Sequence, residues 1–239
     1  MLTQDQFNQY CDRLGLSETA RMVLKIIRSS PPVRQVRSSA KNVAVRYPSC
    51  KMGVVIQAES HRNELAFVYE YEYDEAVLEY FDQPSIIKLQ YRAKSGRNVG
   101  VLHTPDFFVM RADSCGWEEC KTEEDLPKLA EEMPERYVWD EQVGWRCPPG
   151  EQYAAQFGCY YRIRSSAEIN WVLQRNLLFL EDYLRADCPE VSQVVTAKIR
   201  ELVAAEPGLK LDQLLEPNGP ANNDDIYRLI ATEAIYADW

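Results

Sequence analysis

The sequence predicts an α/β fold in which a sheet is flanked by helices, with a helical extension before it and a helical module after it. Strand-like segments separated by turn residues run from Pro84 to Lys121, and helical spacing of apolar residues dominates both ends of the chain. The 239 residues are enough for one large domain with an appendage, or for two small domains. No apolar run approaches the roughly 18 residues of a membrane span.

Two short helices are expected at the N-terminus, over Thr3–Arg13 and Ser17–Arg28. Ser17 is suited to cap the second, and the prolines of "SSPP" end it because proline lacks the backbone donor. An extended stretch is expected to follow, as far as Ser49.

The charge of the chain is unevenly distributed. The net charge is −10, so the whole surface does not attract nucleic acid. From Ala20 to Ala58, however, there are eight basic residues and no acidic one, which favours contacts with phosphates. A solvated face on a connecting segment is the alternative. Five residues of this segment are the candidate DNA contacts: Arg34, Arg37, Lys41, Arg46 and Lys51.

The middle of the chain predicts a helix followed by three strands. The helix is "AESHRNELAFVYEYEYD", with Ser60 as its cap and Glu64 in its second turn. The strands are "PSIIKLQYRA", "VGVLHTPDFFVMRA" and "WEECK", separated by the turns "SGRN" and "DSCG". "YYRIRS" is a further strand, and Ser165 with Glu168 has capping-box spacing before a long helix over 169–184.

After Pro189 the pattern is helix, helix, helix and strand, which is typical of a winged-helix module. The helices are expected over 191–205, 211–215 and 223–232, and the strand in "AIYADW". Nine acidic residues against four basic ones from Glu190 to Trp239 favour packing or protein binding over DNA reading. Because the chain ends inside the expected wing, the natural polypeptide is expected to continue beyond Trp239.

The hairpin "HTPDFFVMRADSCGWEECK" carries the candidate site. With a turn centred near Asp113–Ser114, Asp106 lies opposite Lys121. Alternation puts Glu119 on the face of Lys121 and makes Glu118, on the other face, a dispensable neighbour. Carboxylates that converge in this way hold a hard cation for phosphodiester hydrolysis, and a lysine beside them stabilises the charged transition state. A plain cross-strand ion pair is the alternative interpretation.

A series of motifs in order resembles the TnsA family, the endonuclease subunit of heteromeric transposases. They are Glu59-Ser60 with Glu64, Asp74, Gln83-Pro84, "TPDF" at 104–107, and Glu119-Cys120-Lys121. The resemblance covers Val36 to Leu126 and continues more loosely to Leu184. It implies the restriction-endonuclease-like, PD-(D/E)xK fold with a mixed sheet.

The resemblance also implies roles for individual residues. Catalysis falls to Glu64, Asp106, Glu119 and Lys121, and the metal ligands are Glu64, Asp106, Glu119 and the backbone carbonyl of Cys120. The cofactor is Mg²⁺, with Mn²⁺ as a substitute. His103, close to Asp106, is expected at the surface or behind the site. The expected domains are a helical and basic extension over 1–38, the nuclease domain over 39–187 and the winged-helix-like module over 188–239.

The resemblance implies a DNA endonuclease that cuts one strand at transposon ends. Its partners are DNA, a TnsB-like DDE transposase and a TnsC-like AAA+ regulator, in the prokaryotic cytoplasm and without a membrane. Two alternatives stay open. One is a stand-alone restriction or repair nuclease, and the other is a non-catalytic DNA-binding or adaptor protein.

Overall fold

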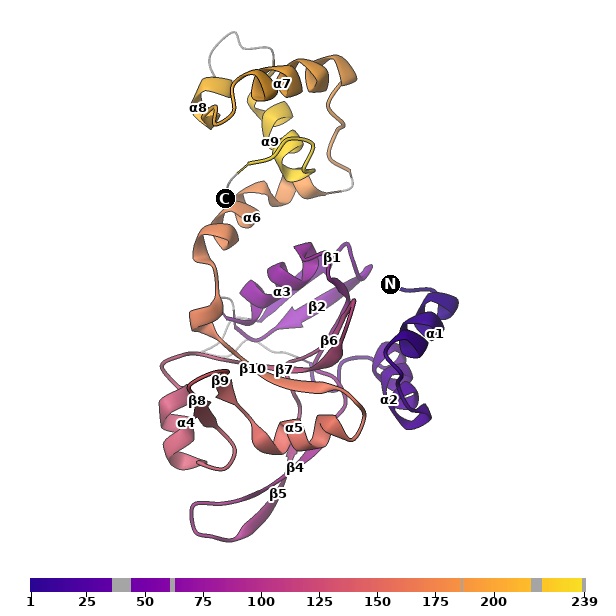
Figure 1. Cartoon of the computed structure of the whole chain (residues 1–239), viewed down its shortest axis with the longest axis vertical. Coiled ribbons are helices and arrows are strands. Elements are labelled where there is room, and N and C mark those ends of the chain that lie inside the picture. The colour runs from indigo at the N-terminus through magenta and orange to yellow at the C-terminus, as the bar shows by residue number, and fades with distance from the viewer. Residues whose placement is uncertain (36–43, 61–62, 186, 216–220, 238–239) are drawn as a thin grey trace. The chain divides into compact units, whose positions relative to one another are not determined.

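A computed structural model describes residues 1–35, 44–60, 63–185, 187–215 and 221–237 of the chain. The chain divides into two compact units, Met1–Ile169 and Asn170–Trp239 (Figure 1). This division differs from the expected domains, since the N-terminal helices belong to the first unit and the long helix after Ile169 belongs to the second. No helix among the described residues is long and apolar enough to cross a membrane.

The helices and strands of the two units follow one another in the chain. The first unit contains α1 (Gln4–Arg13), α2 (Glu18–Ser29), β1 (Val45–Ser49), β2 (Val54–Ala58), α3 (Glu64–Tyr73), β3 (Val77–Asp82), β4 (Ile87–Arg92), β5 (Asn98–His103), β6 (Phe107–Arg111), β7 (Cys115–Lys121), α4 (Leu126–Glu132), β8 (Val138–Asp140), β9 (Gly144–Arg146), α5 (Pro148–Ala155) and β10 (Tyr160–Ser165). The second unit contains α6 (Trp171–Leu184), α7 (Gln193–Ala205), α8 (Leu211–Leu214) and α9 (Asn223–Ala231).

The N-terminal helices are part of the nuclease unit rather than a separate extension. Both begin as the sequence predicts, with Ser17 accepting a hydrogen bond from Ala20 N at the start of α2. Phe7 and Leu24 are fully buried in the core that covers one face of the central sheet. Arg28 adds an ion pair of 2.7 Å with the buried Glu79 of β3. Apolar burial and this ion pair therefore fix α1 and α2 to the unit.

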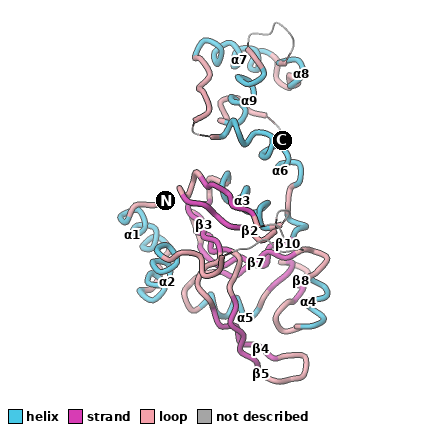
Figure 2. The backbone as a smooth tube through the Cα atoms, turned by 180° about the vertical axis from the view of Figure 1, so that it is seen from behind, coloured by secondary structure: helices cyan, strands magenta, loops and turns pink. Residues whose placement is uncertain are grey.

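The central sheet has four strands in the order β10-β7-β6-β3. β10 runs parallel to β7, whereas β7–β6 and β6–β3 are antiparallel, so the sheet is mixed. The structure thus agrees with the expected mixed sheet flanked by helices. α3 and the β1–β2 hairpin lie on one side of the sheet, and α5 lies on the other (Figure 1, Figure 2).

Alternation along the strands sorts the central side chains between the two faces. Phe108 of β6 and Trp117 of β7 are register partners and pack their rings 5.0 Å apart in the core on the α5 side. Phe107 and Glu118 are also partners and face α3, where Tyr71 contacts both. Each face of β7 therefore meets a different set of side chains.

The expected strand "VGVLHTPDFFVMRA" is two strands in the structure. β5 pairs with β4 in a separate hairpin, and β6 enters the central sheet. The interruption falls at 104–106, where Pro105 has no N–H to donate to a ladder. As a result, Asp106 lies at the beginning of β6, near the end of β7. The "SGRN" turn forms as predicted, with Gly96 at φ +81°.

The second unit confirms the predicted helices but not the winged helix. Asn170, rather than Ser165, caps α6, because the Ser165–Glu168 capping box closes a separate 3₁₀ turn over Ser166–Glu168. The strand expected in "AIYADW" is absent over 234–237, the part of it that the structure describes. There the chain turns after Glu233, at φ +54°, and Ile235 packs into the helical core.

Candidate functional site

Asp106 is held at the junction of β5 and β6 by backbone contacts. Its carboxylate Oδ2 accepts a hydrogen bond of 2.7 Å from the Cys120 N–H of β7. Its carbonyl accepts one of 2.9 Å from the Gln83 N–H. Gln83 is a buried residue in the left-handed region, at φ +44°, and strain of this kind is concentrated at functional sites. The Gln83-Pro84 dipeptide that the sequence singles out thus positions the candidate aspartate.

Lys121, at the end of β7, lies between two carboxylates. Its Nζ is 2.8 Å from Glu119 Oε1 and 4.0 Å from Asp106 Oδ2. The register differs from the expected one: Phe107 pairs with Glu118, which sets Asp106 opposite Glu119 instead of Lys121. Because the difference is two residues, the predicted sharing of a face by these groups is unchanged.

Glu64 joins this cluster from the first turn of α3. It is buried, and its Oε2 accepts a hydrogen bond of 2.7 Å from the Glu59 N–H. Burial, followed by the charge of Asp106, raises the pKa of Glu64 to about 8. Burial also raises the pKa of Asp106, although Lys121 acts in the opposite direction. The positive charge near these two carboxyls therefore does not offset their burial, which is the electrostatic condition of a cation site before the cation binds.

Glu119 lies in an enclosure of protein donors. Tyr137 and Tyr161 donate to its two oxygens at 2.9 and 2.6 Å, His103 Nε2 lies 3.2 Å from Oε2, and Arg136 lies 3.6 Å from Oε1. Burial alone would raise its pKa, but Lys121, His103 and Arg136 outweigh burial and hold that pKa well below the usual range. Glu119 is therefore an ionised partner of Lys121.

The sequence did not indicate three of these neighbours. Tyr137, Tyr161 and Arg136 come from a loop and from β10, far from the hairpin in the chain. The sequence predicts a strand at "YYRIRS", but it does not show that this strand pairs with β7. That pairing is what brings Tyr161 next to the hairpin. His103 lies behind the site, in contact with Glu119. This is one of the two positions expected from the sequence.

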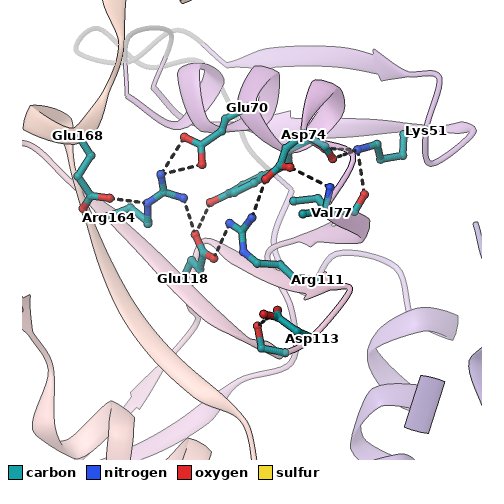
Figure 3. Close-up of polar contacts among 12 residues, drawn as sticks. Lys51, Glu70, Asp74, Val77, Arg111, Asp113, Glu118, Arg164 and Glu168 are labelled. Atoms are coloured by element: carbon teal, nitrogen blue, oxygen red, sulfur yellow. Dashed lines mark hydrogen bonds and ion pairs between the residues drawn. The ribbon is translucent and has the colours of Figure 1, made fainter. Parts of the chain in front are cut away.

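Glu118 has a structural role that the sequence did not indicate, because it is the buried anionic centre of a second network (Figure 3). It pairs with Arg164 at 2.9 Å and with Arg111 at 3.2 Å, and it accepts hydrogen bonds of 2.8 Å from Tyr71 and Tyr160. Burial would raise its pKa, but the two arginines lower it below the ordinary value. The predicted orientation of Glu118 away from Lys121 holds, and the contacts give it a structural role; that cleavage does not need it stays a prediction.

Arg164 extends this network to α3 and to the 3₁₀ turn that follows β10. Its guanidinium also contacts Glu70 of α3 at 2.8 Å and Glu168 at 2.9 Å, and Arg111 contacts Asp74 at 3.0 Å (Figure 3). The network joins α3, β6, β7 and β10. It therefore fixes the helix that carries Glu64 relative to the strands that carry Asp106 and Lys121.

The candidate DNA contacts have different surroundings. Arg46 is exposed on β1, and Arg34 contacts Glu59 and, at 3.3 Å, Gln83 Oε1. The Lys51 ammonium donates to the carbonyls of Tyr71, Asp74 and Val77 at 2.7 to 2.9 Å, as Figure 3 shows in part. Lys51 thus supports the end of α3. Arg37 and Lys41 lie outside the described residues.

The donor atoms near Asp106 suit a hard cation. No three His, Cys, Asp or Glu side chains in the described ranges are grouped closely enough to enclose a metal ion. The paired carboxyls of Glu64 and Asp106, with the Cys120 carbonyl on the adjoining strand, nevertheless offer only oxygen, the donor that Mg²⁺ and Mn²⁺ prefer. The Cys120 thiol is buried and its pKa is raised well above the ordinary value, so it is not a thiolate ligand.

Comparison with known protein families gives one match. Residues 74–166 match the family model described as the TnsA-like endonuclease N terminal. This part of the chain is a TnsA-like endonuclease domain. The matched span includes Asp106, Glu119 and Lys121, while Glu64 precedes it. The TnsA-like assignment makes the domain a nuclease of DNA transposition with the restriction-endonuclease-like fold. No curated protein gives a significant match to the chain.

Proposed function

We propose that the chain is the metal-dependent endonuclease subunit of a transposase and hydrolyses one strand at transposon ends. The observation that carries the proposal is the pair of carboxyls, Glu64 and Asp106, whose pKa values are raised and which lie beside the Lys121 ammonium. The neighbouring Glu118 network has a full complement of arginines and would gain nothing from a cation. Of these two networks, the one around Asp106 therefore has the electrostatics that a phosphodiester nuclease needs.

Glu64, Asp106 and the Cys120 carbonyl would hold the cation, which we propose is Mg²⁺. When bound, it supplies charge neutralisation and a lower pKa for a coordinated water. The Cys120 N–H orients Asp106 for this role through its hydrogen bond to Oδ2. Both oxygens of Glu119 already accept hydrogen bonds from protein donors. In this proposal Glu119 therefore holds Lys121 in place and is not a main ligand of the cation.

Lys121 acts as a charged donor in this proposal and not as a base. Burial would lower its pKa, but Glu119 and Asp106 outweigh burial and raise it. A permanently protonated amine, 26 % exposed, can donate to a phosphate oxygen as negative charge develops there. Glu119 keeps the ammonium aligned through the 2.8 Å contact.

The partners follow from the TnsA-like family and from the charge of the chain. A protein of net charge −10 gains little affinity for DNA from its overall field. We propose that a TnsB-like DDE transposase and a TnsC-like AAA+ regulator bring it to the transposon ends. The exposed Arg46 of the described basic segment would then contact phosphates locally, whereas Arg34 is paired with Glu59.

The test is Asp106→Ala in the assembled system with supercoiled transposon donor and Mg²⁺. We expect strand cleavage by this subunit to fall at least a thousandfold, while the melting temperature and partner binding persist. Lys94→Ala, on the exposed β4–β5 turn, is the matched control and should cut normally. Unimpaired nicking by Asp106→Ala would overturn the site, and cutting without any partner would favour a stand-alone nuclease.

A further inference from the structure

A pair of tryptophans borders a cavity beside the candidate active site. Trp139 of β8 and Trp145 of β9 pack edge to face, with ring centroids 5.3 Å apart. They line a cavity of about 410 Å³ together with Tyr161, Arg162, Ser165 and Glu123. Trp139 is 56 % exposed, which is a large apolar surface to leave in water.

The walls of this cavity are continuous with the catalytic strand. Tyr161 lines the cavity and donates its hydroxyl to Glu119 at 2.6 Å. Ser165 lines it and is the register partner of Lys121. Glu123, two residues after Lys121, accepts a hydrogen bond of 3.2 Å from the Trp145 indole. A group bound here would be close to whatever Lys121 contacts.

The arginines around the cavity are already paired with carboxylates. Arg162 contacts Glu168 at 2.7 Å, and Arg146 contacts Glu151 and Asp140. A phosphate needs unpaired arginine or lysine, and this cavity does not favour one. A flat neutral ring with hydrogen-bonding edges fits better, because an exposed indole provides a stacking surface and the carboxylates accept from amino groups.

We propose that this cavity binds a single nucleobase from the DNA next to the cleaved phosphodiester, unstacked from its neighbours and stacked on Trp139. The inference rests on the proposed endonuclease function. Stacking on the indole offsets the free energy of unstacking, and the base then fixes the backbone beside Lys121. The pocket positions the cut, and it does not take part in the hydrolysis.

The experiment combines a protein variant with a DNA variant. Full-length chain in the transposase assembly is given transposon-end duplexes with one abasic site, scanned through the positions around the cut. Binding is measured in Ca²⁺ and cleavage in Mg²⁺. We expect one abasic position to lower binding and cleavage roughly tenfold, Trp139→Ala to do the same on intact DNA, and the two losses not to multiply. Trp139→Phe should restore most of the loss.

Leu102→Ala, on the separate β4–β5 hairpin and 72 % exposed, is the control for loss of a surface apolar side chain. Losses that multiply at every position, or a Trp139→Ala protein that binds and cuts as wild type, would overturn the inference. A loss that is equal on all duplexes and needs a partner protein would identify a protein-docking surface instead, which also overturns it. Failure of the proposed function is distinct, since wild type and Asp106→Ala would then behave alike on intact DNA.

Discussion

The two faces of β7 use adjacent glutamates for opposite purposes. On one face, Glu118 is enclosed by Arg111 and Arg164, and its charge is neutralised within the protein. On the other, Glu119 pairs with the Lys121 ammonium at the end of the strand, where the carboxyls of Asp106 and of Glu64 from α3 have raised pKa values. Buried charge as such does not identify a functional site. A local deficit of counter-charge does.

Glu118→Gln provides the largest expected change in stability. The substitution leaves the buried Arg164 and the partly buried Arg111 without their shared counter-charge, and breaking such a buried pair costs about 3–5 kcal/mol. We expect urea denaturation to show a loss of this size. At urea concentrations below the unfolding transition of the variant, cleavage per folded molecule should stay near the wild-type value.

Glu119→Gln is the matched variant on the opposite face. It removes the anionic partner of Lys121, so cleavage per folded molecule should fall at least about a hundredfold. If Glu118→Gln were as stable as wild type, or if both variants lost cleavage equally, the two faces would not have the separate roles described above.

The sequence predicted which glutamate shares the face of Lys121, because strand alternation depends only on position. It could not predict what lies on the opposite face. Arg164 and Tyr160 reach Glu118 from β10, more than forty residues away, and only the parallel pairing of β10 with β7 brings them there. For the same reason, the sequence could not predict the contacts of Tyr137 and Arg136 with Glu119.

The fold was predictable where pattern and turns coincide, and less so elsewhere. The hairpin of β6 and β7 follows from two strand-forming segments on either side of the turn "DSCG". The edge strand β3 was not assigned, because "VLEYFD" follows a helix of similar tyrosine and glutamate content with no glycine between them. Residues 234–237 show the converse, since this described part of the expected wing packs on helices without forming a strand.

Divalent cations should stabilise the protein through Glu64 and Asp106. At a hundred times the dissociation constant, binding adds about 2.7 kcal/mol to the free energy of unfolding. Without metal, the raised pKa of Glu64 means that stability falls as pH rises from the ordinary carboxyl value of 4.5 toward about 8, because ionisation is costlier in the folded state. The gain from Mg²⁺ should grow over that window, since the metal displaces the proton.

Thermal melts at several pH values, with and without Mg²⁺, check this expectation. Glu64→Gln should flatten the metal-free pH dependence and remove most of the Mg²⁺ gain, while Glu70→Gln, at the surface side of the Arg164 network, should keep both. An Mg²⁺ gain that is unchanged in Glu64→Gln would exclude Glu64 as a ligand.

The smallest expected effects come from two variants in the basic segment. They distinguish a residue that supports the fold from one that contacts DNA. Lys51 donates to three backbone carbonyls, so Lys51→Ala should cost about 1–3 kcal/mol in unfolding and leave DNA affinity unchanged when folded. Arg46 is exposed, so Arg46→Ala should change stability by less than about 0.5 kcal/mol. It should also weaken DNA binding uniformly and reduce the salt slope by about 1. Binding titrations at several salt concentrations measure both slopes, and a reduced slope for Lys51→Ala with unchanged stability would return that lysine to the DNA-contacting surface.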